Sequence, residues 1–291
     1  MMRYCSPLAK SFRKIGIAAL LAGMSTLCHA QQQGPPIGET VFDGDYVTLG
    51  IGAAIGPSYD GSDNYTISPL PVIIGSVAGI DVQPRGPGFA ADFITDQSGA
   101  KIDYVLGPVV RARFDRNNSI KDDVVQRLGE LDVAIELGAV AGLQVNRVLH
   151  PFDSLTAEVD LRWDVAGAHN GMVVAPSLTY FSPLSRSVAV SMAITAEYVD
   201  DDYADYYFSI DPTGSAASGL PSFAADSGWK NVGLTMFTGL DLDGDITNGG
   251  WGLSIIGSYS RLLEDAKQSP VTSIRGDADQ LFLALGIGYT F

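Results

Sequence analysis

Histidine is the side chain that enzymes most often use as a general base, and two histidines follow the first thirty residues of this chain. His150 stands before Pro151 in a turn-like segment, and His169 lies in the Gly-rich stretch 166–171, with Asp164 nearby. A lipase, acyltransferase or protease would need one of them beside a nucleophile or a second acid. The chain has no Gly-x-Ser-x-Gly elbow, and the two histidines lack metal-ligand spacing. We interpret both as surface turn residues and expect no catalytic and no cofactor-binding residue.

Two acidic clusters carry the carboxylate oxygens that a divalent cation such as calcium prefers. They are Asp200, Asp201, Asp202 and Asp205, and, further on, Asp241, Asp243 and Asp245. The second cluster mimics the start of a calcium loop, but its glycine stands at the fourth place instead of the sixth. Gly252 occupies the twelfth place, where such a loop needs a glutamate. We interpret 241–250 as a solvated turn and 200–205 as a mobile acidic loop, and we expect no metal site.

The elements that position these residues alternate between apolar and polar side chains. From residue 131 one parity reads Leu131, Val133, Ile135, Leu137, Ala139, Ala141, Leu143 and Val145, and charged, small or amide residues dominate between them. The stretch 154–165 repeats the pattern with Leu155, Ala157, Val159, Leu161, Trp163 and Val165. A period of two gathers the charges on one face of a β-strand, whereas a helix would scatter them.

The same period recurs along most of the chain. It is clear over 47–55, 188–197, 231–240, 251–260 and 281–291, and less regular near 68–80, 86–95, 102–114, 171–181 and 203–210. About 12 strands result (range 10–14), many of them long enough to cross a bilayer when tilted. A soluble sandwich also alternates, but its strands are usually shorter. We therefore predict an all-β fold, an antiparallel transmembrane β-barrel over residues 45–291, closed so that every backbone group is paired in lipid.

On this prediction the polar parity of the strands faces the barrel lumen. The charged residues at these positions are Asp132, Glu136, Glu158, Asp160, Arg162 and Asp164, with Arg111 and Arg113 on the strand before. Such charges either pair across strands and fill the interior, or line a water-filled channel, where an excess of acid favours cations. Both alternatives stay open. Aromatic residues near the strand ends are typical of a membrane-interface girdle: Tyr46, Trp163, Tyr180, Phe181, Tyr198, Tyr203, Trp229, Trp251, Tyr259 and Tyr289.

The first thirty residues have the composition of a secretory signal peptide. Basic residues between Arg3 and Lys14 precede the apolar run 15–27, and Ala30 ends a small-residue cleavage site. Without residues 1–30 the chain loses both cysteines, Cys5 and Cys28, so we expect no disulfide and no thiol nucleophile. Its net charge falls from −15 to −19, which argues against nucleic-acid binding. Residues 31–44 are interpreted as a flexible lead-in.

Short motifs spread over nearly the whole remaining chain resemble those of one family of Gram-negative outer-membrane proteins. They are Tyr59–Tyr65 with Pro69, Arg111–Arg116, Glu136–Ala139, Gly167–Gly171, Asp202–Phe208, Ser218–Pro221, Arg261–Ala266 with Ser269–Pro270, Gln280, and the terminal Tyr289–Phe291. In this order they are similar to the MltA-interacting protein (MipA/OmpV) family. After Phe208 the chain departs from the family pattern, with Ser209-Ile210 in place of Gly-Val. The resemblance implies an outer-membrane barrel that links a murein lytic transglycosylase to a murein synthase, without a catalytic motif.

Four functions follow as hypotheses. The first is a non-enzymatic scaffold in outer-membrane lipid that contacts murein-metabolising enzymes through its periplasmic turns. The second is a small-solute, cation-leaning channel, because the lumen-facing set is acidic. The third is a surface adhesin or receptor, because the long connections are acidic and rich in tyrosine. An enzyme acting on lipid or peptide is the fourth, and it would depend on His169.

Overall fold

A computed structural model describes residues 40–97, 99–117 and 120–291. The strands in this part of the chain form one closed antiparallel barrel in which each strand pairs with its neighbours in sequence and β1 pairs with β12. The strands are β1 (Tyr46–Pro57), β2 (Tyr65–Val77), β3 (Ile80–Pro84), β4 (Gly88–Asp92), β5 (Ile102–Arg113), β6 (Ala134–Asn146), β7 (Ser154–Asp164), β8 (Met172–Pro183), β9 (Val188–Val199), β10 (Gly228–Asp241), β11 (Gly250–Leu262) and β12 (Asp279–Thr290). The predicted fold and its 12 strands are confirmed. The predicted signal peptide lies outside the described residues.

The apolar parity of the strands points away from the barrel. On β12, Leu283 and Leu285 are 54% and 59% exposed, whereas Ala284 between them is 2% exposed. The same inversion holds on β1, where Ile51 is 66% exposed and Ala54 is buried. A soluble protein would hide these side chains. Their outward exposure all round a closed sheet is the lipid-facing belt of a membrane barrel.

Glycines close the seam between the first and the last strand. Gly52 lies opposite Gly286, and Gly50 opposite Gly288. A Cβ atom added to Gly52 would approach the Leu285 carbonyl oxygen to 2.5 Å, so a larger residue would push the two strands apart. The seam therefore needs glycine for close backbone approach.

Two strands are much shorter than the others. β3 and β4 form a hairpin whose tip is Arg85–Pro87, and the β3 pairing with β2 covers only Ile80–Val82 against Gly75–Val77. β4 in turn pairs with β5 only from Val109 to Arg111. The sequence pattern over 68–80 and 86–95 predicted strands here, but it did not reveal how little of the wall they cover.

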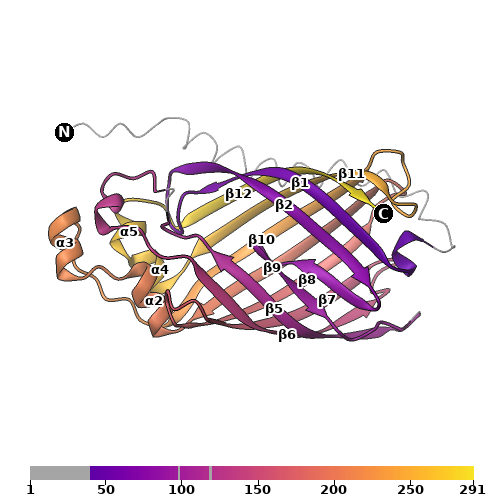
Figure 1. Ribbon diagram of the computed structural model, residues 1–291, viewed down its shortest axis with the longest axis horizontal. Helices are drawn as coiled ribbons and strands as arrows, with labels where there is room; N and C mark the ends of the chain where they lie inside the picture. The colour runs from indigo at the N-terminus through magenta and orange to yellow at the C-terminus, as the bar shows by residue number, and fades with distance from the viewer. Residues whose placement is uncertain (1–39, 98, 118–119) are drawn as a thin grey trace.

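The two ends of the barrel differ in the length of their connections. The turn end holds 78–79, 93–101, 147–153, 184–187 and 242–249, together with both ends of the β1–β12 seam, Tyr46 and Thr290. The loop end holds 58–64, 114–133, 165–171, 200–227 and 263–278. Outer-membrane barrels usually place short turns in the periplasm and long loops outside. Figure 1 shows the helices gathered at the loop end and the C-terminus at the opposite end.

The loop-end connections fold into short helices. These are η3 (Val125–Leu128), α2 (Asp201–Phe208), α3 (Pro212–Ser218), α4 (Glu264–Gln268) and α5 (Pro270–Ser273), while η2 (Val41–Asp43) precedes β1. The predicted strand near 203–210 is wrong, and so is the mobile loop at 200–205. Asp200 caps α2 by accepting a hydrogen bond from Tyr203 N at 3.1 Å, and this local bond favours a helix over an extended chain. Among the described residues, no helix is long and apolar enough to cross a bilayer.

Aromatic residues mark both rims of the wall. Trp229 packs edge-on against Tyr198 at the loop end, and Trp251 packs edge-on against Tyr289 at the turn end. Both tryptophans are exposed on the outer face, as an interfacial girdle requires. Tyr203, which the sequence also assigned to the girdle, is instead buried inside the loop-end helices.

Candidate functional site

Glu197 on β9 is the centre of an ion-pair network inside the loop half of the barrel. Its Oε1 accepts hydrogen bonds from Arg111 and Arg113 on β5, both at 2.9 Å, and from Arg162 on β7 at 3.1 Å. Its Oε2 lies 2.6 Å from Lys230 Nζ on β10. One carboxylate thus joins three strands other than its own, on both sides of it in the wall. Because the group is buried, these pairs replace the water it gave up on folding.

Glu136 on β6 forms the second node of this network. It bonds Arg113 through Oε1 and Arg162 Nε through Oε2, the latter at 2.9 Å. His169 Nε2 lies 3.5 Å from Glu136 Oε1. His169 Nδ1 accepts a hydrogen bond from Gly171 N at 3.0 Å, and His169 Nε2 is buried without a hydrogen-bond partner. The histidine therefore lies against the buried carboxylate without a hydrogen bond to it.

A third group of charges ties the hairpin tip to β7. Arg85 Nη2 lies 2.9 Å from Glu158 Oε2, and Arg85 Nε lies 3.6 Å from Asp160 Oδ2. Asp160 also accepts from Arg162 at 2.8 Å, so this group is continuous with the Glu197 node. The second oxygen of Glu158, Oε1, is buried without a hydrogen-bond partner.

Lys230 carries the network out to the first loop. Its Nζ lies 2.7 Å from Asp60 Oδ2, and the Asp60 backbone N donates to Asp115 Oδ1 at 2.7 Å. Burial and the neighbouring charge of Asp60 raise the pKa of Asp115 to about 6. Burial also acts to raise the pKa of Asp60, but Lys230 outweighs it and the pKa falls below the ordinary value. Loop 58–64 is thus fixed to the barrel interior by charge.

The network is electrically balanced. Among the described residues, five cations meet five anions: Arg85, Arg111, Arg113, Arg162 and Lys230 against Asp60, Glu136, Glu158, Asp160 and Glu197. The acidic excess expected for a cation-selective lumen is absent from this set. Of the two alternatives that the sequence left open, pairing across strands describes the loop half of the lumen.

An apolar cap covers the network at the loop end. Tyr203 and Tyr207 of α2 pack around the His169 ring, with centroids 4.8 and 5.6 Å away. The Arg113 guanidinium lies 5.0 Å from the centre of the Tyr203 ring. The buried cluster draws on four of the loop-end connections. It includes Tyr59 from 58–64, Ile120 and Val125 from 114–133, Ile210, Leu220 and Ala225 from 200–227, and Ala266 and Val271 from 263–278. The long connections therefore form a packed lid and not separate mobile arms.

Six of the eight lumen charges predicted from the sequence belong to this network: Arg111, Arg113, Glu136, Glu158, Asp160 and Arg162. Asp132 is exposed before β6, and Asp164 instead caps the 165–171 turn by accepting from the backbone N of Ala166 and His169, both at 2.9 Å. Sequence reasoning missed Asp60, Arg85, Glu197 and Lys230. Glu197 stands at a lumen-facing position of the predicted strand 188–197, so the alternation pattern could have placed it among the predicted lumen charges. The other three lie at strand ends or in turns, where parity gives no signal.

The interpretation of His169 as a surface residue is wrong, because its ring is 3% exposed beneath α2. His150 lies in a turn-end loop, where its Nε2 is 2.9 Å from Ser182 Oγ. The segment 241–250 is a turn, as predicted, and Asp241 caps it by accepting from the backbone N of Asp243, Gly244 and Asp245. Within the described residues, no group of three or more histidine, cysteine or acidic side chains is arranged to hold a metal ion.

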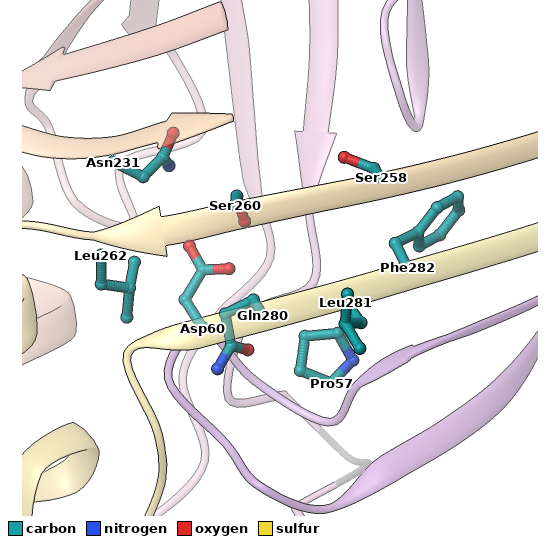
Figure 2. A pocket seen from close by; sticks show the side chains of 9 residues that line it. All are labelled: Pro57, Asp60, Asn231, Ser258, Ser260, Leu262, Gln280, Leu281 and Phe282. Carbon is teal, nitrogen blue, oxygen red and sulfur yellow. The ribbon is translucent and has the colours of Figure 1, made fainter. Parts of the chain in front are cut away.

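A small cavity of about 230 Å³ lies beside the network, between the first loop and β10–β12. Figure 2 shows Asp60 pointing toward it from the loop and Gln280 from β12. The other lining residues are Pro57, Asn231, Ser258, Ser260, Leu262, Leu281 and Phe282. The Gln280 Oε1 atom is buried without a hydrogen-bond partner. The cavity is thus polar on one side, but its acid is already neutralised by Lys230.

A closed antiparallel barrel with an outward apolar belt and aromatic rims defines an outer-membrane β-barrel protein. The family model described as "MltA-interacting protein MipA" matches residues 49–291, and the chain belongs to this family. Among solved structures it is similar to the COG4313 outer membrane channel from Pseudomonas putida F1, at 15% identity and a TM-score of 0.45, over 89% of this chain and 100% of that one. It is also similar to OccK11 (OpdR) from Pseudomonas aeruginosa, at 9% identity and a TM-score of 0.29, over 90% and 99%. No curated protein matches.

Proposed function

We propose that this protein is a non-enzymatic scaffold in the outer membrane that holds murein-processing enzymes at its periplasmic turn end. The family description names an interaction with MltA for the family, and this supports a murein lytic transglycosylase as one partner. A murein synthase is the second partner that the family resemblance implies. In this proposal residues 1–30 export the chain, and the loop-end lid serves to seal the barrel.

The observation that carries the proposal is an apolar turn at the turn end. In the connection 147–153, Leu149 is 79% exposed, and Val148 and Phe152 are each more than a third exposed. Asp153 holds the turn by accepting from the backbone N of Val148 at 2.7 Å and of Leu149 at 2.9 Å. A rigid turn that presents apolar side chains can bind a partner at little entropic cost.

The shape of this turn is also resistant to acid. Burial would raise the pKa of Asp153, but the Tyr180 hydroxyl and the backbone donors of the turn outweigh it and lower the pKa to about 2. The carboxylate therefore stays ionised, and keeps accepting these bonds, at any pH of the periplasm. The bonds that Asp153 accepts should therefore not change between pH 5 and 8, a range that lies well above this pKa.

The test is capture of a purified periplasmic lytic transglycosylase by the barrel in detergent. We expect the double variant Leu149→Ser and Phe152→Ser to reduce capture about tenfold, which is a usual loss when central apolar contacts are removed. The matched control is Leu242→Ser, which removes an exposed apolar residue from a different turn at the same end. No enrichment of the enzyme over an unrelated barrel would contradict the proposal.

A small-solute channel is the second candidate, and the turn half of the lumen favours it. There the inward residues of β8–β11 include the hydroxyl-bearing Thr179, Ser191 and Ser254, which are half-buried. The balanced charge network of the loop half gives no reason to expect cation preference there, whereas Asp92 and Asp103 are buried in the turn half. Planar-bilayer recordings of the refolded barrel decide between the two, since a sealed scaffold should show no conductance above background.

A further inference from the structure

One stretch of the barrel wall has no strand beside it. β2 pairs with β1 along its whole length, but its pairing with β3 stops at Gly75. Beyond that point β3 continues only against β4, up to the hairpin tip. In the part of the chain that the structure describes, no backbone hydrogen bond joins 65–74 to a strand on that side. The stretch covers all of β2 except its last three residues, Gly75–Val77.

The sequence of β2 prevents another strand from closing this stretch. The backbone N of Phe291 donates a hydrogen bond to the Val47 carbonyl oxygen. The backbone N–H and C=O groups of odd-numbered β1 residues therefore point toward β12, and those of even-numbered residues point toward β2. Even-numbered β1 residues pair with even-numbered β2 residues, so the backbone N–H and C=O groups of odd-numbered β2 residues point away from β1, to the side where no strand follows. Pro69 and Pro71 occupy two of these positions and have no N–H to donate. An added strand would lose those bonds, so the prolines keep the edge unpaired.

The lumen surface next to the unpaired edge is apolar. Leu70, Val72 and Ile74 point inward from β2 and are half-buried. Beyond the hairpin, Ala90 on β4, Val109 on β5 and Val140 on β6 form a separate buried apolar cluster. The hydroxyl-lined strands β9–β11 contrast with this side of the lumen. The unpaired edge of β2 thus carries apolar side chains on its outer face, such as Ile67 and Ile73, and on its lumen face.

Two guanidinium groups lie at the hairpin tip, beyond the point where β3 stops pairing with β2. Arg85 points into the lumen toward Glu158, and Arg111 lies close to Gly86, where an added Cβ atom would be 3.8 Å from Arg111 Nε. Arg111 Nε is buried and has no hydrogen-bond acceptor. A free donor on a cation suits an anionic head group, and an apolar surface suits a hydrocarbon chain.

We propose that the unpaired stretch of β2 is a lateral passage through which a single-chain anionic amphiphile, of the long-chain carboxylate class, moves between the bilayer and the lumen. The chain slides over Leu70 and Val72, and the carboxylate is met by Arg111 and Arg85 at the hairpin tip. The Arg85–Glu158 pair holds the hairpin in its present position. This passage is independent of any enzyme bound at the turn end.

The experiment uses the full barrel in phosphatidylcholine vesicles and dodecanoate carrying a nitroxide on its chain. Residues 31–291 contain no cysteine, so a fluorophore can be attached at one chosen site. Val72→Cys places it on the lumen face beside the opening, and Thr195→Cys places it on the lumen face of the continuous wall. We expect nitroxide quenching to be several times stronger at position 72. Equal quenching at both positions would overturn the proposal.

Head-group and variant controls test the rest of it. Arg85→Gln should weaken quenching at position 72 about fivefold, as expected for one lost charge-assisted hydrogen bond, whereas Arg186→Gln in an exposed turn should not. An alkyl trimethylammonium carrying the same nitroxide should quench weakly. Equally strong quenching by that cation, or by a nitroxide-labelled phospholipid, would overturn the assignment to a single-chain carboxylate. Gel mobility of unheated samples confirms that each variant is folded.

Discussion

The two halves of the lumen follow the same alternation but are filled differently. In the loop half the inward residues are long and charged, and Glu136, Arg162 and Glu197 are all buried. In the turn half of β8–β11 they are uncharged over most positions and partly exposed, as at Thr179, Ser191 and Ser254, whereas Asp92 and Asp103 are buried in the turn half of β4 and β5. A period of two decides which side faces inward. The size and charge of the inward residues decide whether that part of the barrel is solid.

The comparison also separates two ways of satisfying polar groups inside a wall of lipid-facing strands. A hydroxyl can remain hydrated in a wide lumen or bond across strands, as Thr235 and Ser258 do at 2.9 Å. A charge that has been taken out of water needs its counter-charge, because an uncompensated buried ion is costly. The loop half should therefore respond strongly to loss of a single charge, and the turn half of β8–β11 should not.

The largest effect is expected for Glu197→Gln. The change preserves the shape of the side chain but leaves Arg111, Arg113 and Lys230 without their shared counter-charge. We expect the free energy of unfolding to fall by about 3–5 kcal/mol, the usual cost of breaking a buried ion pair. Urea unfolding in vesicles, followed by gel mobility, measures it. Glu130→Gln at an exposed loop-end position is the control, and a loss for Glu197→Gln no larger than the control's would contradict the network's role.

A smaller, pH-dependent effect is expected for Asp115→Asn. With a pKa raised to about 6, folded Asp115 favours its protonated form, so its ionisation destabilises the fold as pH rises through 6. The variant should match the wild type near pH 3 and become more stable than it by pH 8. The difference is at most about 3 kcal/mol, from the gap between about 6 and the ordinary 3.8. Urea midpoints at several pH values measure it, with exposed Asp123→Asn as control. A difference that does not change with pH would refute this account.

The smallest effect is expected for Arg275→Gln, at the outer edge of the lid. Arg275 Nη2 lies 2.6 Å from Asp122 Oδ2, but Arg275 is a third exposed. Asp122 also accepts from the backbone N of Val124 and Val125, so it would stay satisfied. We expect a loss of about 1 kcal/mol or less in the free energy of unfolding, as for other exposed pairs. A loss comparable to that of Glu197→Gln would mean that the lid and the network unfold as one unit.

This pair also titrates in the opposite direction to Asp115. Burial would raise the pKa of Asp122, but Arg275 and the two backbone donors outweigh it and lower the pKa. The stabilisation from the pair is therefore present above the ordinary carboxyl pKa and is lost as the pH falls below it. The difference between Arg275→Gln and the wild type should accordingly vanish in acid.

Alternation was enough to predict the barrel, its approximate strand number and six of the network residues, because parity alone places a side chain inside or outside. It failed where tertiary context decides. The tyrosines at 203, 206 and 207 favour a strand by propensity, yet the Asp200 cap and burial of the Tyr203 and Tyr207 rings make a helix. Arg85 and Lys230 reach the network from a hairpin tip and a strand end. Only the closing of the barrel brings them near their partners.

The pairing of β1 with β12 has a consequence for biogenesis. Each of these strands lacks one neighbour until the other arrives, so the wall remains open along a full strand length while the intervening 200 or so residues are being delivered to the membrane. During that interval the glycine-rich edges at Gly52 and Gly286 are exposed to foreign strands. A variant that slows the pairing of β1 with β12 should increase misassembly and degradation of the precursor while leaving the mature barrel as stable as before.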